Sequence, residues 1–150
     1  MKVVIQRVTS ASVSINQQVK SEIKKGLLIL LGIGRNDNVN DVDWLANKIS
    51  NLRIFSDAEG KMNKSITDVG GEILLISQFT LHAQTKKGNR PSFIKSAKPE
   101  QAIPLYHKMI EVLSQQTNSE VKTGEFGADM QVSLVNDGPV TIIIDTENKE

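Results

Sequence analysis

The sequence predicts an α+β fold: mainly antiparallel or mixed β-sheet layers with two principal helices packed on them. Three observations predict it. Strand-like segments outnumber helix-like ones, only two segments carry apolar residues at helical spacing, and the last third ends in two strand-like segments around a turn, which suggests an antiparallel pair. We expect a single domain over residues 1–150, because no repeat, linker or low-complexity tract interrupts the chain.

The first 24 residues predict a strand followed by a hairpin. Residues 2–9 alternate between two faces, and Arg7 shares its face with apolar residues. If that face is buried, the guanidinium of Arg7 needs carbonyl or carboxylate acceptors. The alternative is an edge strand from which the arginine reaches water. Residues 12–24 are typical of a hairpin that turns at residues 16–18.

The middle of the chain predicts two buried strands with a helix between them. Residues 27–33 and 73–79 are largely apolar runs, as expected for strands covered on both faces. Between them, Asp37 or Asn40 is suited to cap a helix. The apolar face of that helix is formed by Val42, Leu45, Ile49 and Leu52.

The last third predicts a second helix and three strands. Pro99 suits the first turn of a helix. Its apolar face is formed by Ala102, Tyr106, Met109 and Leu113. A short strand is expected near residues 120–123. Residues 130–134 then alternate as a half-buried strand, and residues 140–144 form a β-branched run that predicts a more deeply buried one.

The segment between those last two strands, residues 136–141, is the most informative one. Asp-Gly between two strands normally predicts a tight two-residue hairpin. Pro139 has no amide donor to close such a turn. A turn with Gly138 and a cis Pro139 at its centre is the leading alternative, although only about 5–6% of X–Pro bonds in folded proteins are cis. Such a turn would point the Gly138 carbonyl in an unusual direction, which suits recognition.

Composition is that of an ordinary soluble protein. The chain is 39% hydrophobic and 23% charged, has no cysteine, and begins without the pattern of a signal peptide. We therefore expect a cytoplasmic protein without a membrane partner. The net charge of +1 gives no global field typical of nucleic-acid binding. However, no acidic residue lies between Glu72 and Glu100, where Lys86, Lys87 and Arg90 occur. This stretch is either a solvated basic loop or a local phosphate-contacting patch.

Conventional catalytic motifs are missing from the sequence. His107 and Glu111 stand four residues apart on a predicted helix, but without a third ligand nearby they are better interpreted as an exposed pair, so we expect no metal site. No serine lies in a Gly-x-Ser-x-Gly elbow. The segment 77–81 is more suggestive, because an apolar strand ends there in three hydrogen-bonding side chains around one aromatic. Those side chains either cap backbone groups or converge on a small polar ligand.

Two segments of the chain are Ser77-Gln78-Phe79-Thr80-Leu81 and Asn136-Asp137-Gly138-Pro139-Val140-Thr141. Together they resemble the two signature motifs of the D-aminoacyl-tRNA deacylase family. The resemblance runs from Met1 to the last strand. It extends to Trp44-Leu45, Leu52-Arg53-Ile54-Phe55, Gly60-Lys61-Met62-Asn63, Arg90-Pro91-Ser92-Phe93 and Phe126-Gly127-Ala128-Asp129-Met130. The loop at residues 84–97 departs from the family in being less arginine-rich.

The resemblance implies a homodimeric enzyme without a cofactor. It would hydrolyse the ester between a D-amino acid, or glycine, and the 3′-terminal adenosine of tRNA, and would reject L-aminoacyl-tRNA, which is chiral proofreading of translation. The ribose 2′-hydroxyl of the tRNA would assist, and Thr80 would position rather than attack. The partners expected are tRNA and a second copy of the chain, with no DNA and no membrane.

The resemblance also implies roles for individual residues. The catalytic residues would be Ser77, Gln78, Phe79 and Thr80, which line the pocket beside the ester and the adenosine. Gly138 and Pro139 would be joined by a cis bond and reach into the partner subunit's pocket, where their carbonyls hold the α-amino group. Supporting residues would be Arg7, which binds the Gly138–Pro139 segment, together with Met130 and Asn136. Candidates for tRNA contact are Lys86, Lys87 and Arg90.

Two other classes of function fit the same residues. An esterase with Ser77 or Thr80 as nucleophile would act on small esters without tRNA. A non-catalytic module that binds the tRNA 3′ end would bind RNA in a salt-dependent way and leave the ester intact.

Overall fold

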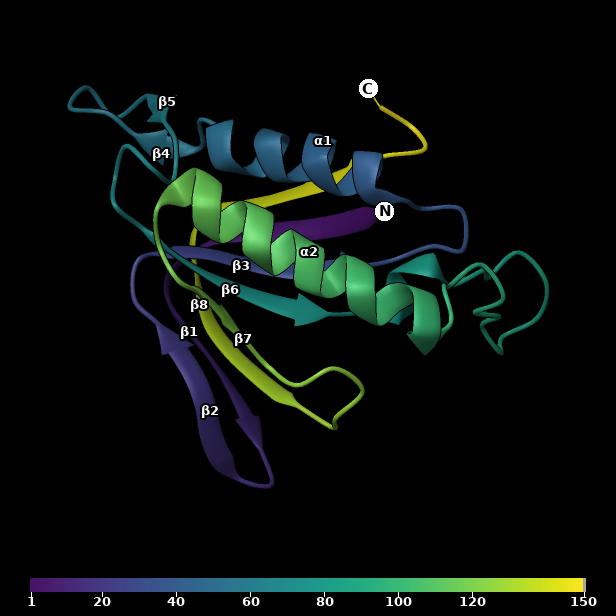
Figure 1. The fold of residues 1–150 in the computed structure, drawn as a ribbon. Helices are drawn as coiled ribbons and strands as arrows, with labels where there is room; N and C mark the ends of the chain where they lie inside the picture. The colour runs from purple at the N-terminus through teal and green to yellow at the C-terminus, as the bar shows by residue number, and fades with distance from the viewer. Residues whose placement is uncertain (150) are drawn as a thin grey trace.

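The computed structural model describes residues 1–149 and shows an α+β fold, as the sequence predicts (Figure 1). The strands are β1 (Lys2–Ile15), β2 (Gln18–Ile23), β3 (Gly26–Gly32), β4 (Phe55–Ser56), β5 (Met62–Lys64), β6 (Glu72–Ser77), β7 (Val121–Thr123) and β8 (Gln131–Asp145). The helices are α1 (Val39–Asn51), the 3-10 helix η1 (Phe79–His82) and α2 (Pro99–Thr117). No helix within residues 1–149 is both long enough and apolar enough to cross a membrane.

The main sheet is mixed. Its strand order is β2-β1-β3-β6-β7, and β8 pairs with the other edge of β1. β1 is antiparallel to β2, β3 and β8, whereas β6 is parallel to β3 and β7. The hairpin expected at residues 16–18 is confirmed, with Asn16 and Gln17 at φ of 50° and 64° in the turn between β1 and β2. Positive φ at both central residues is the geometry that matches the twist of the flanking strands.

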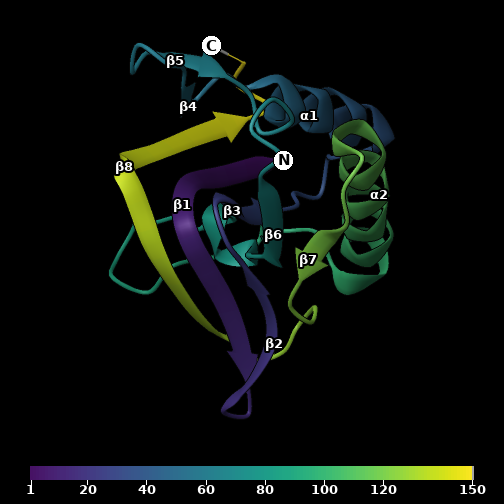
Figure 2. The same ribbon diagram turned by 90° about the vertical axis from the view of Figure 1, so that its left-hand side faces the viewer.

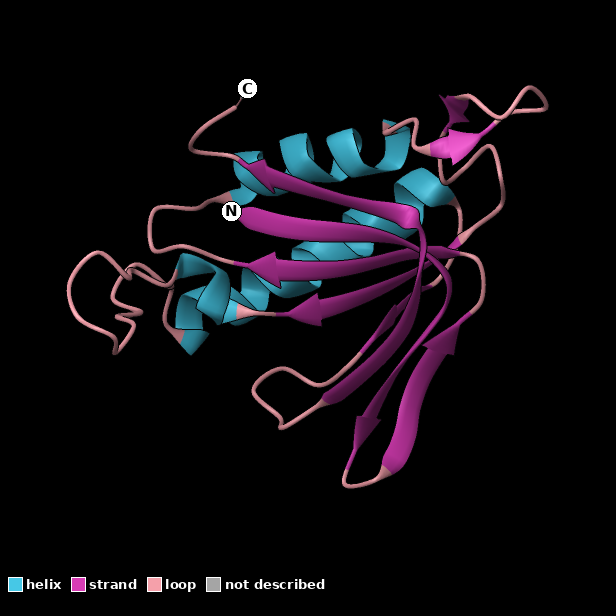
Figure 3. Cartoon of the chain, turned by 180° about the vertical axis from the view of Figure 1, so that it is seen from behind, coloured by secondary structure: helices cyan, strands magenta, loops and turns pink. Residues whose placement is uncertain are grey.

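Both long helices cover the same face of the sheet (Figure 2). The main core lies between them and the strands. It includes Val3, Ile5, Leu45 and Met109. A second, smaller core forms where β1 and β8 bend and the lower half of the sheet curls on itself, around Val8, Ala11, Val13, Ile23, Leu28, Leu74 and Ile76. The upper half of the opposite sheet face carries no helix (Figure 3).

Two predictions about the last third are wrong. Residues 140–144 are not deeply buried, because their side chains alternate between half-buried and exposed. Residues 131–145 do not form two strands around a reversing turn; they form one strand, β8, that pairs with β1 along its length. Gln6 pairs with Thr141 and Val8 with Asn136, so residues 137–140 stand opposite the single residue Arg7. We call residues 137–140 the bulge. The chain leaves the sheet at the bulge and then continues in the same direction, because the segments on both sides of it pair with β1 and not with each other.

The predicted cap of the first helix is also wrong. Neither Asp37 nor Asn40 caps α1. Asn38 does, accepting from the amide of Asn40 at 2.9 Å, while the carboxylate of Asp41 accepts from the amide of Asn38 at 3.0 Å. This reciprocal pair is a capping box. The predicted start of α2 at Pro99 is confirmed. The small hairpin of β4 and β5 was not expected, since neither strand is longer than three residues.

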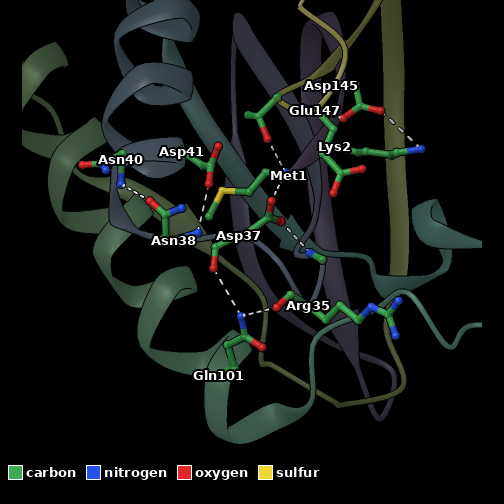
Figure 4. A network of polar contacts seen from close by, with 12 residues as sticks. Met1, Lys2, Arg35, Asp37, Asn38, Asn40, Asp41, Gln101, Asp145 and Glu147 are labelled. Atoms are coloured by element: carbon green, nitrogen blue, oxygen red, sulfur yellow. Dashed lines mark hydrogen bonds and ion pairs between the residues drawn. The ribbon is translucent and has the colours of Figure 1, made fainter.

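Asp37 instead belongs to a polar network around the amino group of Met1 (Figure 4). The amino group of Met1 donates to Asp37 Oδ1 and to Thr146 Oγ1, and both acceptor residues are buried. Asp37 Oδ2 accepts from the amide of Gly34 at 2.6 Å. From α2, the side-chain amide of Gln101 donates to the carbonyls of Arg35 and Asp37, at 3.0 and 3.2 Å. This network fixes the carboxyl end of β3 beside the first turn of α2.

Candidate active site

A cleft of about 310 Å³ opens at the carboxyl end of β6. Its walls come from the ends of β3 and β6, the start of α2 and the segment before β8. The lining residues are Leu31, Ile33, Ile76, Ser77, Gln78, Phe79, Ala97, Ala102, Phe126, Gly127, Ala128, Asp129, Met130 and Val132. Most of them are apolar, and the polar side chains among them are Ser77, Gln78 and Asp129. A mostly apolar lining with a few polar groups is the usual character of a small-molecule site.

The end of β6 places the predicted residues in this cleft. The amide of Gln78 donates to the carbonyl of Leu31 at 2.7 Å, which continues the pairing of β6 with β3 for one residue. The chain then turns into η1, so the predicted strand of residues 73–79 ends early, at Ser77. Ser77, Gln78 and Phe79 therefore line the cleft. Thr80 lies in η1 outside the lining, and its hydroxyl accepts from the side-chain amide of Gln78.

Tyr106 supports β6 from the helix side. Its hydroxyl donates to the carbonyl of Leu75 at 3.0 Å, and its ring lies 5.8 Å from that of Phe126, which lines the cleft. Burial raises the pKa of Tyr106 to about 12, because the phenolate would lose its hydration. Tyr106 thus remains a neutral donor and holds the strand that ends in Ser77.

Neither histidine lines the cleft. His82, the last residue of η1, is buried, and its Nε2 atom has no hydrogen-bond partner among residues 1–149. His107 lies on α2, where Glu111 pairs with Lys108 at 3.1 Å rather than with the imidazole. Within residues 1–149 there is no group of three or more His, Cys, Asp or Glu side chains placed to hold a metal ion.

Arg7 lies on the buried face of β1, with 9% of its surface exposed. Its Nη1 donates to the carbonyl of Ile54 at 2.7 Å. Its Nε lies 3.1 Å from Asp137 Oδ2, an ion pair whose angle is not that of a hydrogen bond. The first of the two interpretations from the sequence is therefore confirmed: Arg7 shares its face with the core, and its guanidinium donates to a carbonyl and pairs with a carboxylate.

Arg7 also faces the bulge at Gly138. The Gly138–Pro139 peptide bond is cis, and Gly138 has φ of +126°. A Cβ atom at Gly138 would lie 2.8 Å from Val140 Cγ2 and 3.1 Å from Arg7 Nη2. Such distances are shorter than ordinary van der Waals contacts, so only glycine fits there without displacement of the arginine.

The side chain of Asn136 bridges the two ends of the bulge. Its side-chain amide donates to the carbonyl of Arg7 and to the carbonyl of Val140, both at 3.0 Å. One amide thus joins the two ends of the bulge to each other and to β1. This arrangement holds Gly138 and Pro139 outward from the sheet, and neither residue lines the cleft of its own chain.

Apart from Thr80, which lies beside the cleft and binds Gln78, the predicted site residues fall into three groups. Ser77, Gln78, Phe79 and Met130 meet in the cleft. Arg7, Asn136, Gly138 and Pro139 meet at the bulge. Lys86, Lys87 and Arg90 lie in an exposed loop that begins shortly after η1.

Several lining residues received no functional role from the sequence, among them Ala97 just before α2, Ala102 near the start of α2 and Asp129 before β8. Asp129 is the one ionisable side chain among the lining residues. Its signal in the sequence is the resemblance of residues 126–130 to the family. The alanines carry no functional signal in a sequence, since alanine is common in helices and loops alike.

Comparisons with known proteins identify the family of this chain. Residues 4–145 match the family model described as "D-Tyr-tRNA(Tyr) deacylase". Proteins named D-aminoacyl-tRNA deacylase from Bacteroides thetaiotaomicron and Flavobacterium psychrophilum are 62% and 60% identical to this chain, each over 100% of both chains.

Solved structures with the same fold are also known. One, named "c-Myc DNA Unwinding Element Binding Protein", has a TM-score of 0.93 and 43% identity, covering 97% of this chain and 99% of its own. Another is described as "Structural Analysis of a probable eukaryotic D-amino acid tRNA deacylase". It has a TM-score of 0.81 at 14% identity, covers 95% of this chain and 97% of its own, and shows the fold alone. On the family model and these full-length relatives, the chain belongs to the D-Tyr-tRNA(Tyr) deacylase family.

Proposed function

We propose that this protein is a D-aminoacyl-tRNA deacylase, which hydrolyses the ester of D-aminoacyl-tRNA and of glycyl-tRNA and so removes D-amino acids from tRNA. The full-length similarity to deacylases at about 60% identity carries the proposal. The cleft is consistent with it, because it is large enough for an aminoacyl group and carries polar groups at the end of β6.

The proposed chemistry relies on orientation rather than on a strong base. An aminoacyl ester is already labile, so a positioned water and donors to the developing oxyanion can accelerate its hydrolysis. Ser77, Gln78 and Phe79 line the cleft where the ester would lie. Thr80 holds the side chain of Gln78 in place. The 2′-hydroxyl of the tRNA ribose assists the attack.

The proposed selection of chirality relies on the bulge. Gly138 and Pro139 project from the sheet, held by Asn136 and facing Arg7. In the proposal they enter the cleft of a second copy, and their carbonyls accept from the α-ammonium of the substrate. An L side chain would then be directed against protein, while D side chains of many kinds would pass.

This selection requires a homodimer, and the helix-free face of the sheet is suited to form it (Figure 3). In the sheet register Val4 pairs with Leu30 on one side and with Ile143 on the other. These three apolar side chains form a row across β3, β1 and β8, and Ile143 is 72% exposed. Exposed apolar surface of this kind is typical of a protein interface. We propose that the partner subunit covers this row, in the cytoplasm, where charged tRNA is used.

Incubation with D- and L-aminoacyl-tRNA of one amino acid tests the proposal. Release of the D-amino acid alone is expected. Release of both isomers, or of neither, would contradict it.

Two further measurements separate the alternative functions. A Ser77 or Thr80 esterase would form an acyl-enzyme, which mass spectrometry would detect after quenching, and would accept small esters. A non-catalytic module would bind RNA and release no amino acid. With Thr80→Ala we expect slower release without any covalent adduct.

A further inference from the structure

Beside the cleft lies a loop that the proposed chemistry does not use. Gln84 and Ser92 pair with each other, the amide of Gln84 donating to the carbonyl of Ser92 at 2.8 Å and the amide of Ser92 donating back at 3.0 Å. Residues 85–91, which we call the arm, therefore project from a fixed base into solvent, beyond η1 and the first turn of α2 (Figures 1 and 3).

The arm and its base are strongly basic. Five of the 18 Lys and Arg residues and none of the 17 Asp and Glu residues lie between residues 73 and 99. They are Lys86, Lys87, Arg90, Lys95 and Lys98. None of these five forms an ion pair within residues 1–149, in contrast to Lys2, Lys108 and Lys122, which each pair with a carboxylate. The positive charge of the arm is thus available to a ligand.

Exposed apolar side chains lie between the arm and the cleft. Phe93 packs edge to face against Phe79, with ring centroids 5.1 Å apart and planes at 75°. Phe79 is 56% exposed, Phe93 36% and Ile94 66%. Since Phe79 lines the cleft, the ring of Phe93 continues the cleft toward the arm. Ser96 Oγ donates to the carbonyl of Phe79 at 3.0 Å, which ties the segment after Phe93 to η1.

Basic side chains beside exposed aromatic rings are the pattern of proteins that bind single-stranded nucleic acid, in which bases stack on rings and cations contact phosphates. We propose that Phe93 and the arm bind the unpaired nucleotides that precede the terminal adenosine of the tRNA: a base stacks on Phe93, and Lys86, Lys87 and Arg90 contact the phosphates. This inference rests on the proposed function. It predicts that the tRNA strand runs from the cleft past Phe93 toward the arm.

Nested substrates test the base contact. Hydrolysis is measured on D-aminoacyl-adenosine, on the D-aminoacyl trinucleotide ending in CCA, and on D-aminoacyl-tRNA. Phe93→Leu keeps an apolar side chain but removes the ring. We expect kcat/KM to fall about ten-fold further on the trinucleotide and on tRNA than on aminoacyl-adenosine, and Phe93→Tyr to restore it. An equal fall on all three substrates, or none, would overturn the assignment.

Salt dependence tests the phosphate contacts. The double variant Lys86→Ala/Lys87→Ala should reduce the slope of log affinity against log salt by about 0.7 for each lysine that binds a phosphate. Lys20→Ala/Lys61→Ala removes the same charge from exposed positions outside the arm and should leave the slope unchanged. Equal slopes for both double variants would overturn the phosphate contacts.

Binding of an uncharged RNA ending in CCA, followed by fluorescence anisotropy, keeps this inference separate from the proposed function. If the protein hydrolyses no ester but Phe93→Leu weakens RNA binding about ten-fold, the proposed function fails and the RNA surface stands. If the variant binds the RNA as tightly as the parent does, Phe93 does not contact RNA and the inference fails. The inference also fails if the variant changes the oligomeric state of the protein in sedimentation, because Phe93 then contacts protein.

Discussion

At the scale of single residues, Arg7 shows how far sequence reasoning reaches. Its place on an apolar strand face implied that it needs oxygen acceptors, and the structure supplies the carbonyl of Ile54 and the carboxylate of Asp137. The need is local and could be predicted. The partners could not, because Ile54 is 47 residues away and Asp137 lies on another strand. Cleft residues such as Ala97 escaped prediction for the same reason: their role depends on position alone.

Gly138 is the residue for which a substitution is most informative. Gly138→Ala should cost about 1–2 kcal/mol of stability through its positive φ and should also displace Arg7 Nη2 and Val140. We therefore expect lower activity on D-aminoacyl-tRNA and weaker rejection of the L isomer, measured by initial rates on both.

Gly60→Ala is the matched control for this substitution. Gly60 also has a positive φ, of +79°, but a Cβ atom there meets nothing within 4 Å. The control should show the cost in stability, measured by urea denaturation, without a change in chiral selection. Loss of selection in both variants would point to a general effect of stability.

At the scale of elements, the predictions succeeded where the signal is local. The turn at Asn16 and Gln17, the buried strands and the start of α2 were all found from patterns within a few residues. The wrong helix cap and the wrong chain reversal have physical reasons. Asp37, Asn38 and Asn40 are all of residue types that cap helices, and the sequence does not show that Asp37 is already bound to the amino group of Met1. The Asp-Gly pair suggested a reversal, but pairing with β1, more than 120 residues earlier, keeps β8 in one direction.

The contact between α2 and β6 yields a prediction about alkaline pH. Tyr106 binds a proton more tightly when folded, with a pKa of about 12 against an ordinary value of 10. Its contribution to stability is complete below pH 10 and is lost as the pH rises toward about 12. Tyr106→Phe should lower the free energy of unfolding by about 1 kcal/mol at neutral pH, because it removes the hydrogen bond to Leu75.

The difference between Tyr106→Phe and the parent should shrink or reverse at about pH 11, because only the parent loses stability by deprotonation of this group. Urea denaturation of both proteins at neutral and alkaline pH measures it. A constant difference at both values would contradict burial of the phenol as the cause.

At the scale of the whole molecule, the buried ion pair between Met1 and Asp37 is a specific source of stability. The buried ammonium of Met1 has the carboxylate of Asp37 as its counter-charge. Asp37→Asn removes the charge with little change in shape, and we expect a loss of about 3–5 kcal/mol in unfolding free energy, as for other broken buried pairs.

Asp145→Asn is the comparison for Asp37→Asn. It breaks the pair between Lys2 and Asp145, at 3.4 Å and partly exposed, and should cost less than about 1 kcal/mol. The midpoints of urea denaturation of the two variants compare the contributions of the two ion pairs to stability. Similar losses of stability would show that burial does not make the pair at Met1 stronger than the exposed one.

The helix-free face gives a prediction about assembly. Ile143→Ser removes the most exposed member of the row formed with Val4 and Leu30. If this face joins two copies, the variant should dissociate at higher protein concentration than the parent, by sedimentation, and should lose deacylation in parallel. Val19→Ser, at an exposed position on β2 outside the row, is the control. Identical association of both variants would contradict the proposed interface.

The bulge also limits how the chain can change in length. Its two flanking segments are both in register with β1, at Thr141 opposite Gln6 and at Asn136 opposite Val8. A residue lost or gained within 137–140 changes the size of the bulge, because these residues pair with nothing on β1, and Ile142 and Ile144 keep their contacts with the core. A residue lost or gained in either flanking segment would instead shift that segment by one position, so that its side chains change faces. Changes in chain length are thus confined to the bulge and excluded from the paired segments beside it.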